Sequence, residues 1–150
     1  DFAKLLNFYV GFDPKRAAQG LPPEGSARIK RWLNGVLHRG THLLAFRGGD
    51  LIGHALVVPA EEPEVGEYAV FLRKEMRDRG VGTELNRAAA EAARRAGMRK
   101  LWLTVEPANR PAIRSYEKAG FRFKGSPVLS LEVEMEMDLA AEANPGSPAS

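Results

Sequence analysis

The chain has 150 residues, a formal net charge of +3, 44% hydrophobic residues and no cysteine. This length and apolar share are typical of one globular domain with a hydrophobic core. No apolar run reaches the roughly 18 residues that a membrane span needs, and the lack of cysteine excludes disulfides, thiolate metal ligands and a thiol nucleophile. The basic residues gather near 73–79 and 94–100, which favours a local anionic ligand over duplex DNA. We therefore expect a cytoplasmic protein with neither a membrane nor a nucleic-acid partner.

The first part of the chain predicts two amphipathic helices. One begins near Phe2 and is broken from Gly11 onward, and a second is capped by the Ser26 side chain and has one apolar face. The aromatic residues of these helices are more readily core residues than the wall of a binding pocket. They are Phe8, Tyr9 and Trp32.

A β-hairpin is predicted next. Two strand-like runs, Thr41 to Phe46 and Leu51 to Val58, are joined by the turn Arg47-Gly48-Gly49-Asp50. His54 lies within the second run, and we interpret it as a packed side chain rather than a ligand or a base. The loop from Pro59 to Gly66 contains three glutamates, which either form a solvated surface or attract a cationic amine.

A strand, a basic loop and a helix follow. Tyr68 to Leu72 is an apolar run that suits a buried strand, and apolar residues from Val81 recur at helical spacing up to Gly97. Between them lies Arg77-Asp78-Arg79-Gly80-Val81-Gly82-Thr83. A helix that begins after glycines exposes backbone N–H groups, and its dipole adds partial positive charge. This loop therefore suits a polyphosphate.

Two common phosphate-binding motifs do not fit the loop. A P-loop needs Lys and then Ser or Thr after its second glycine, where this chain has Thr83-Glu84. A Rossmann fingerprint needs a third glycine at the position of Leu85. The pattern that fits is Arg/Gln-x-x-Gly-x-Gly, with Arg77, Gly80 and Gly82.

The last part of the chain predicts a strand, a helix and two more strands. Lys100 to Val105 is the strand, and the helix begins near Arg110 and ends at Gly120. Phe121 to Lys124 and Val128 to Met137 are the final strands. Residues 140–150 are rich in Ala, Pro, Gly and Ser, and we expect a disordered tail there.

Two motifs in this order resemble those of the GCN5-related N-acetyltransferases (GNAT). The loop at 77–83 is similar to the acyl-CoA pyrophosphate loop of that family. Asn109 after a strand, with Tyr116 and Glu117-Lys118-Ala119-Gly120-Phe121 closing the next helix, is similar to its second motif. The resemblance covers 41–139 well and the first forty residues in outline.

The resemblance implies an α/β fold with a central twisted mixed sheet and helices on both faces, in one domain over 1–139. The usual first strand of the family is not visible, so we expect the chain to be processed or cut from a longer polypeptide. The implied activity is direct transfer of an acetyl group from acetyl-CoA to a primary amine, on a protein lysine or a small molecule, without a metal. A non-catalytic acyl-CoA-binding module of a larger protein is the alternative, and homodimer formation stays open.

The resemblance also implies which residues bind the coenzyme. The pantetheine arm would pair with the strand, and the diphosphate would lie on the loop. The implied residues are Val70, Phe71, Leu72, Arg77, Asp78, Arg79, Gly80, Val81, Gly82, Thr83 and Asn109. The backbone N–H near Leu72 would face the thioester oxygen. Asn109 has an alternative interpretation as a simple helix cap.

Two catalytic residues are implied. Tyr116 occupies the family's position for the acid that protonates the leaving thiolate, although it could instead only pack on the sheet. In some members of the family that acetylate protein N-termini, a glutamate that acts as the catalytic base stands at the position of Thr104. A threonine cannot act as that base. The run Gly66-Glu67-Tyr68-Ala69-Val70-Phe71-Leu72-Arg73 resembles the start of the motif of bacterial protein-lysine acetyltransferases, in which a glutamate at this place is the base. Glu67 is therefore the predicted base, and Glu106 is the reserve candidate.

Overall fold

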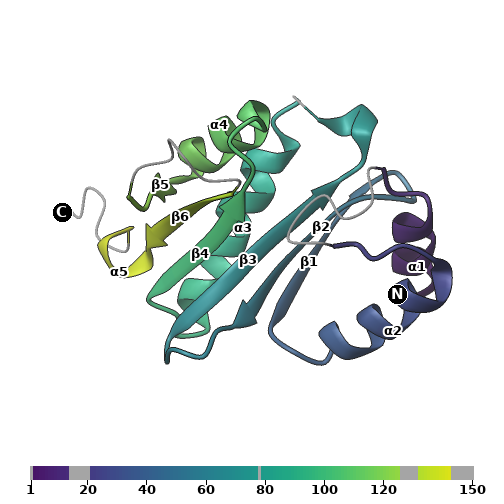
Figure 1. The fold of residues 1–150 in the computed structure, drawn as a ribbon, viewed down its shortest axis with the longest axis horizontal. Helices are drawn as coiled ribbons and strands as arrows, with labels where there is room; N and C mark the ends of the chain where they lie inside the picture. The colour runs from purple at the N-terminus through teal and green to yellow at the C-terminus, as the bar shows by residue number, and fades with distance from the viewer. Residues whose placement is uncertain (1, 14–20, 78, 126–131, 143–150) are drawn as a thin grey trace.

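The computed structural model describes residues 2–13, 21–77, 79–125 and 132–142. It is a six-stranded mixed sheet with helices on both faces (Figure 1), as the sequence predicts. The helices are α1 (Phe2–Val10), α2 (Ser26–Val36), η1 (Lys74–Met76), α3 (Val81–Arg95), α4 (Arg110–Ala119) and α5 (Leu139–Glu142). The strands are β1 (Thr41–Arg47), β2 (Asp50–Pro59), β3 (Val65–Leu72), β4 (Lys100–Val105), β5 (Arg122–Phe123) and β6 (Val133–Asp138).

The strand order is β1-β2-β3-β4-β6-β5. All neighbours pair antiparallel except β3 and β4, which are parallel. A parallel pair needs a crossover connection, and α3 supplies it. The pairing of β3 with β4 covers only three residues, from Val65 to Glu67 on β3. Beyond Glu67 the two central strands part.

Alternating side chains divide the core into two layers. One layer packs under α3 and α4 and contains Tyr68, Leu103 and Met135. The other lies between α1, α2 and the first three strands and contains Phe8 and Phe71. Phe8 and Tyr9 are fully buried in this second layer, so the interpretation of the early aromatic residues as core holds for them.

Two local predictions are wrong. The N-cap of α2 is Gly25 rather than Ser26, and no side chain caps the helix; Ser26 already belongs to its first turn. The tail predicted to be disordered from residue 140 begins with helix, since α5 covers Leu139–Glu142. The last strand is described over Val133–Asp138; its predicted start at Val128 and residues 143–150 of the predicted tail lie outside the described part.

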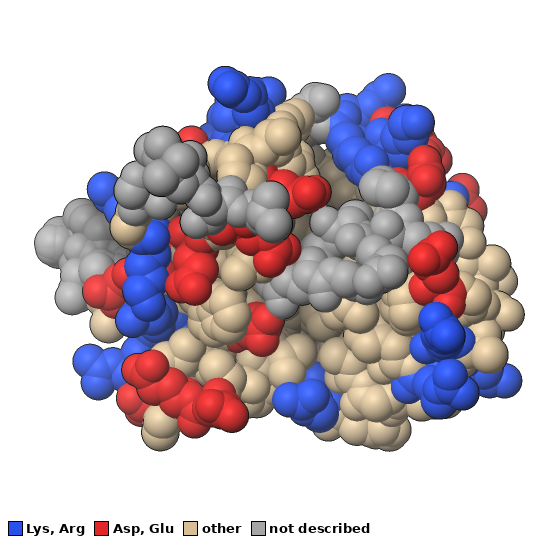
Figure 2. All heavy atoms as spheres, viewed as in Figure 1, with Lys and Arg blue, Asp and Glu red and all other residues tan. Residues whose placement is uncertain are grey.

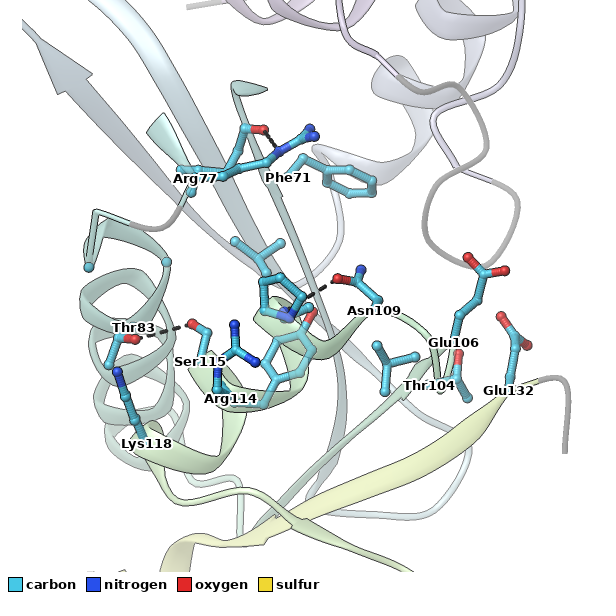
Figure 3. Close-up of a pocket in the computed structure, with 18 of the residues that line it drawn as sticks. Phe71, Arg77, Thr83, Thr104, Glu106, Asn109, Arg114, Ser115, Lys118 and Glu132 are labelled. Carbon is cyan, nitrogen blue, oxygen red and sulfur yellow. Dashed lines mark hydrogen bonds between the residues drawn. The ribbon is translucent and has the colours of Figure 1, made fainter. Parts of the chain in front are cut away.

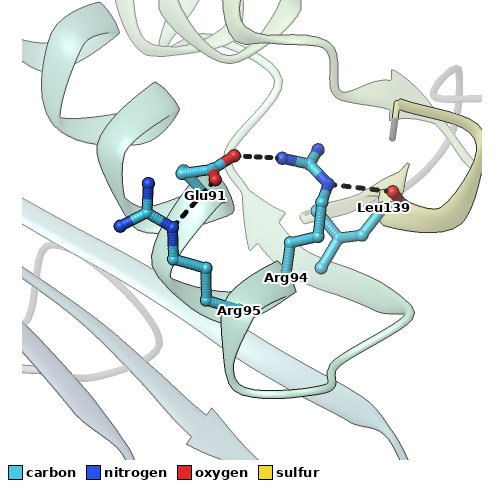
Figure 4. Close-up of polar contacts among 4 residues, drawn as sticks. All are labelled: Glu91, Arg94, Arg95 and Leu139. Carbon is cyan, nitrogen blue, oxygen red and sulfur yellow. Dashed lines mark hydrogen bonds and ion pairs between the residues drawn. The ribbon is translucent and has the colours of Figure 1, made fainter. Parts of the chain in front are cut away.

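The turn into α5 is held by the end of α3 (Figure 4). Arg94 Nε donates to the Leu139 carbonyl at 3.1 Å, and Arg94 Nη1 contacts Glu91 Oε1 at 2.6 Å. Arg95 Nε contacts the other oxygen of Glu91 at 3.0 Å. Leu139 is itself fully buried, so the chain after β6 is fixed to the face of the sheet that α3 and α4 cover.

A chain of buried polar groups joins α1 to the first two strands. The Tyr9 hydroxyl lies 2.6 Å from His54 Nδ1, and His54 Nε2 lies 2.9 Å from His42 Nδ1. His42 Nε2 faces two carbonyl oxygens, of Val36 and Arg39, both at 2.9 Å, so this nitrogen carries a proton. The arrangement in which His54 Nε2 donates to His42 Nδ1 and His54 Nδ1 accepts from the Tyr9 hydroxyl satisfies every member of the chain. His54 is therefore a packed side chain, as the sequence indicates.

This arrangement predicts a loss of stability in acid. Burial, followed by the neighbouring His42, lowers the pKa of His54 from 6.5 to about 3. Between pH 6.5 and about pH 3, His54 therefore binds a proton in the unfolded chain but not in the folded chain. The free energy of unfolding accordingly decreases as the pH is lowered through this range. We expect a loss of about 2 kcal/mol from this group on going from pH 7.5 to pH 5.

Urea unfolding of the wild type and of His54→Gln at both pH values measures this loss. Glutamine retains a hydrogen-bonding amide and does not titrate, so the variant is expected to show a smaller drop than the wild type. An equal drop in the two proteins would contradict the assignment.

Candidate active site

A groove opens where β3 and β4 part. Its cavity volume is about 480 Å³, and its walls come from β3, the loop before α3, the end of β4 and helix α4. Figure 3 shows side chains from these elements converging on it. The residues from β3 are Val70, Phe71 and Leu72, so the structure brings all three predicted strand residues to the groove.

The backbone of β3 presents hydrogen-bonding groups to this groove. Arg73 N–H donates to the Ile52 carbonyl of β2 at 2.9 Å, and N–H groups alternate between the two edges of a strand. The N–H groups of Leu72 and Val70 therefore point to the opposite edge, where β4 has moved away. That edge can pair with an extended ligand as an added strand would.

The first turn of α3 forms one end of the groove. Gly80 is the N-cap with φ 82°, a left-handed conformation that glycine adopts without strain. Gly80, Gly82 and Thr83 line the groove, and a Cβ on Gly82 would lie only 3.2 Å from Ser115 Oγ. The N–H groups of this turn and the helix dipole favour an anion here.

Only some of the predicted loop residues line the groove. Arg77 lines the groove, Val81 is partly buried, Arg79 is exposed and does not line the groove, and Asp78 lies outside the described part. Arg77 Nε donates to the Leu72 carbonyl and its Nη2 to the Asp13 carbonyl, both at 3.0 Å. Its guanidinium also stacks over Phe12, so backbone oxygens and an aromatic ring hold this charge at the rim.

Helix α4 supplies the opposite wall. Tyr116 lines the groove with 9% of its surface exposed, and its ring packs edge-on against Phe121 and Tyr68. Burial raises its pKa to about 12. Among the described residues, no hydrogen-bond partner meets its hydroxyl. Tyr116 therefore packs on the sheet and also offers a protonated hydroxyl to the groove.

Sequence reasoning missed three residues of the same helix. The groove is also lined by Arg114, Ser115 and Lys118. Figure 3 shows these side chains on the same side of the groove as Thr83. Arg114 and Ser115 lie three and four residues after Pro111, and Lys118 lies three residues after Ser115. This spacing places all of them on one face of the helix. That spacing was a usable signal, but nothing in the sequence shows that this face meets α3 rather than solvent.

Asn109 caps α4. Its Oδ1 accepts from the Ala112 N–H at 3.3 Å, and the residue also lines the groove. The capping interpretation is therefore confirmed. A contact with the coenzyme remains a prediction.

The two candidate bases line different cavities. Glu106 lines the groove together with Tyr116, and so does Glu132. Glu67 stands at the last pairing of β3 with β4, opposite Trp102, and lines a second cavity of about 520 Å³ with Glu134 and Glu136. The structure thus brings Glu106 into one cavity with Tyr116, and places Glu67 where the strands begin to part.

The second cavity lies on the sheet face that carries α1 and α2, in the part that these helices leave uncovered. Figure 2 shows acidic side chains gathered over β4 and β6 in this view. Two of them are paired, since Glu136 lies 3.7 Å from Lys100 and Glu134 lies 3.9 Å from Lys124.

Within the described residues no cluster of three potential metal ligands occurs, and no described helix has the length and hydropathy to cross a membrane.

The sequence matches the model of the Acetyltransferase (GNAT) family over residues 5–121. The chain belongs to this family. It is 40% identical over 88 residues to a mycothiol acetyltransferase of Sanguibacter keddieii, covering 55% of this chain and 28% of that protein. It is 47% identical over 78 residues to a streptothricin acetyltransferase of Streptomyces lavendulae, covering 51% and 41%. The match of this GNAT chain therefore spans less than half the length of each relative.

The GNAT fold is also found in solved structures. The structure of AAC(6')-Ib in complex with paromomycin and acetyl-CoA superposes with a TM-score of 0.75 at 24% identity, covering 95% of this chain and 90% of that one. At this identity the likeness concerns the fold alone, and it confirms the mixed sheet with helices on both faces.

Proposed function

We propose that this GNAT domain transfers an acetyl group from acetyl-CoA directly to a primary amine. The observation that carries the proposal is the groove itself. It runs from the unpaired edge of β3 to the first turn of α3, and it contains a protonated tyrosine. Acetyl-CoA bound to AAC(6')-Ib, which shares the fold, supports the choice of coenzyme.

Each part of acetyl-CoA has a matching part of the groove. The diphosphate would accept hydrogen bonds from the N–H groups at the start of α3, with positive charge from Arg77 at the rim. The pantetheine amides would pair with the free edge of β3. The Leu72 or Val70 N–H would then stabilise the oxygen of the tetrahedral intermediate, a contribution for which losing one donor typically costs about a hundredfold or more in rate.

The reaction moves two protons. A lysine-type ammonium has a pKa of about 10.4, so a base must remove a proton before its nitrogen attacks the thioester carbon. Glu67 is the proposed base, because it stands where the strands part and faces the uncovered side from which an amine can approach. When the C–S bond breaks, the Tyr116 hydroxyl donates its proton to the sulfur. The nitrogen of the intermediate loses its second proton, which restores the tyrosine, and the products are the amide, free CoA and the proton taken up by the base.

Calorimetric titration with acetyl-CoA, followed by thiol release with a panel of amines, tests this function. The panel includes a lysine peptide, a polyamine and an aminoglycoside. We expect saturable binding, and thiol release that depends on at least one amine. Binding without amine-dependent release by any of them would favour the acyl-CoA-binding module, and absence of binding would overturn both.

A further inference from the structure

A buried chain of polar side chains connects the sheet to the groove. The Tyr68 hydroxyl on β3 donates to Asn86 Oδ1 at 2.6 Å, and Asn86 Nδ2 on α3 donates to Ser115 Oγ at 3.1 Å. Ser115 on α4 then lies 3.2 Å from Thr83 Oγ1 at the start of α3. Tyr68 and Asn86 are each only 1% exposed, whereas Ser115 and Thr83 line the groove.

The donors and acceptors of this chain have a direction. Burial and the nearby Tyr116 raise the pKa of Tyr68 well above its usual value, so its hydroxyl keeps its proton and donates to the Asn86 oxygen. The amide of Asn86 must then donate to Ser115. Ser115 already accepts from Asn86 and has one proton to give, and the Thr83 oxygen lies within reach.

Hydrogen bonds that all run in one direction polarise and strengthen one another. When Ser115 donates to Thr83, the proton of the Thr83 hydroxyl is left to point away from Ser115. Thr83 lines the groove beside Gly80 and Gly82, so this proton is available where the N–H groups of the first turn favour an anion.

We propose that Tyr68, Asn86 and Ser115 are positioning residues that hold the Thr83 hydroxyl as a hydrogen-bond donor to a phosphate oxygen of the coenzyme. The inference rests on the proposed function, because the phosphate is that of acetyl-CoA. The same chain links β3, α3 and α4, so it also fixes the first turn of α3 relative to the helix that carries Tyr116.

Binding of two ligands separates this role from simple packing. Calorimetry measures the dissociation constant for CoA, and an NMR titration measures that for S-acetylpantetheine, which lacks the diphosphate. Hydrogen bonds to charged groups are stronger than neutral ones, so Thr83→Val is expected to weaken CoA binding about tenfold, with Thr83→Ser near the wild type. Ser115→Ala is expected to weaken CoA binding about threefold or more, and neither change should alter affinity for S-acetylpantetheine.

A double-mutant cycle decides whether Ser115 acts through Thr83. In a Thr83→Val background, Ser115→Ala is expected to cause no further loss of CoA affinity. An equal loss in both backgrounds, or an equal loss for both ligands, would overturn the positioning role while leaving CoA binding by the wild type intact. If the wild type binds no CoA at all, the proposed function itself fails, and the positioning role with it.

Discussion

Replacing Tyr116 by phenylalanine is expected to lower kcat for acetyl transfer by about 10²- to 10⁴-fold, the usual contribution of general acid catalysis. The thiol of CoA has a pKa of about 8.5, so its anion leaves more readily when a hydroxyl donates to the sulfur. Phenylalanine keeps the ring contacts with Tyr68 and Phe121. The dissociation constant of acetyl-CoA should therefore change little, and steady-state kinetics with calorimetry measure the two quantities separately.

The pKa of Tyr116 adds a condition on pH. The acid must be protonated to act, and its pKa of about 12 keeps it protonated at all lower pH values. A fall in kcat between pH 8 and pH 10 would therefore not come from this group. Tyr9→Phe is the matched control, since it removes a buried hydroxyl that lies outside the groove. A similar loss of stability in both variants, with unchanged kcat in both, would assign Tyr116 to packing alone.

Replacing Glu67 by glutamine is expected to lower kcat by about 10²- to 10⁴-fold near pH 7, since the carboxylate that deprotonates the amine is lost. The deficit should shrink as pH rises toward the pKa of the acceptor, because a growing fraction of the amine is then already neutral. The matched variant is Glu106→Gln, which makes the same chemical change within the groove that contains Tyr116. pH–rate profiles of both variants, with one amine acceptor, provide the measurement.

The comparison has two informative outcomes. A strong, pH-dependent loss in Glu67→Gln alone supports Glu67 as the base. The same loss in Glu106→Gln alone moves this role to Glu106, and excludes Glu67.

The positions of most elements could be predicted from the sequence because local signals mark them. Gly120 ends α4 in the left-handed conformation, and Pro111 lies in its first turn. The hairpin turn at Gly48-Gly49 and the apolar periodicity of α3 were similarly plain. The motif of the phosphate-binding loop could also be recognised, since Arg77 and Gly80 precede α3 and Gly82 lies in its first turn.

What could not be predicted depends on contacts between distant segments. The sequence indicated basic residues gathered near 73–79, yet Arg73 Nε donates to the Leu51 carbonyl at 2.8 Å and its guanidinium lies over the Phe8 ring. Asn86 occupies the buried face of α3, and its role depends on Tyr68 and Ser115, which belong to other elements. Likewise, no local pattern in β3 and β4 reveals that they stop pairing after Glu67.

The uncovered part of the sheet bears on how copies of this chain meet one another. Exposed sheet faces tend to stack, but here β6 presents Glu134 and Glu136 outward beside Trp102. Two such faces brought together would bury these carboxylates with the lysines that pair with them, Lys100 and Lys124, and removing paired charges from water is still costly. At neutral pH this surface therefore acts against aggregation, and it leaves a homodimer to form, if it forms, through some other side of the molecule.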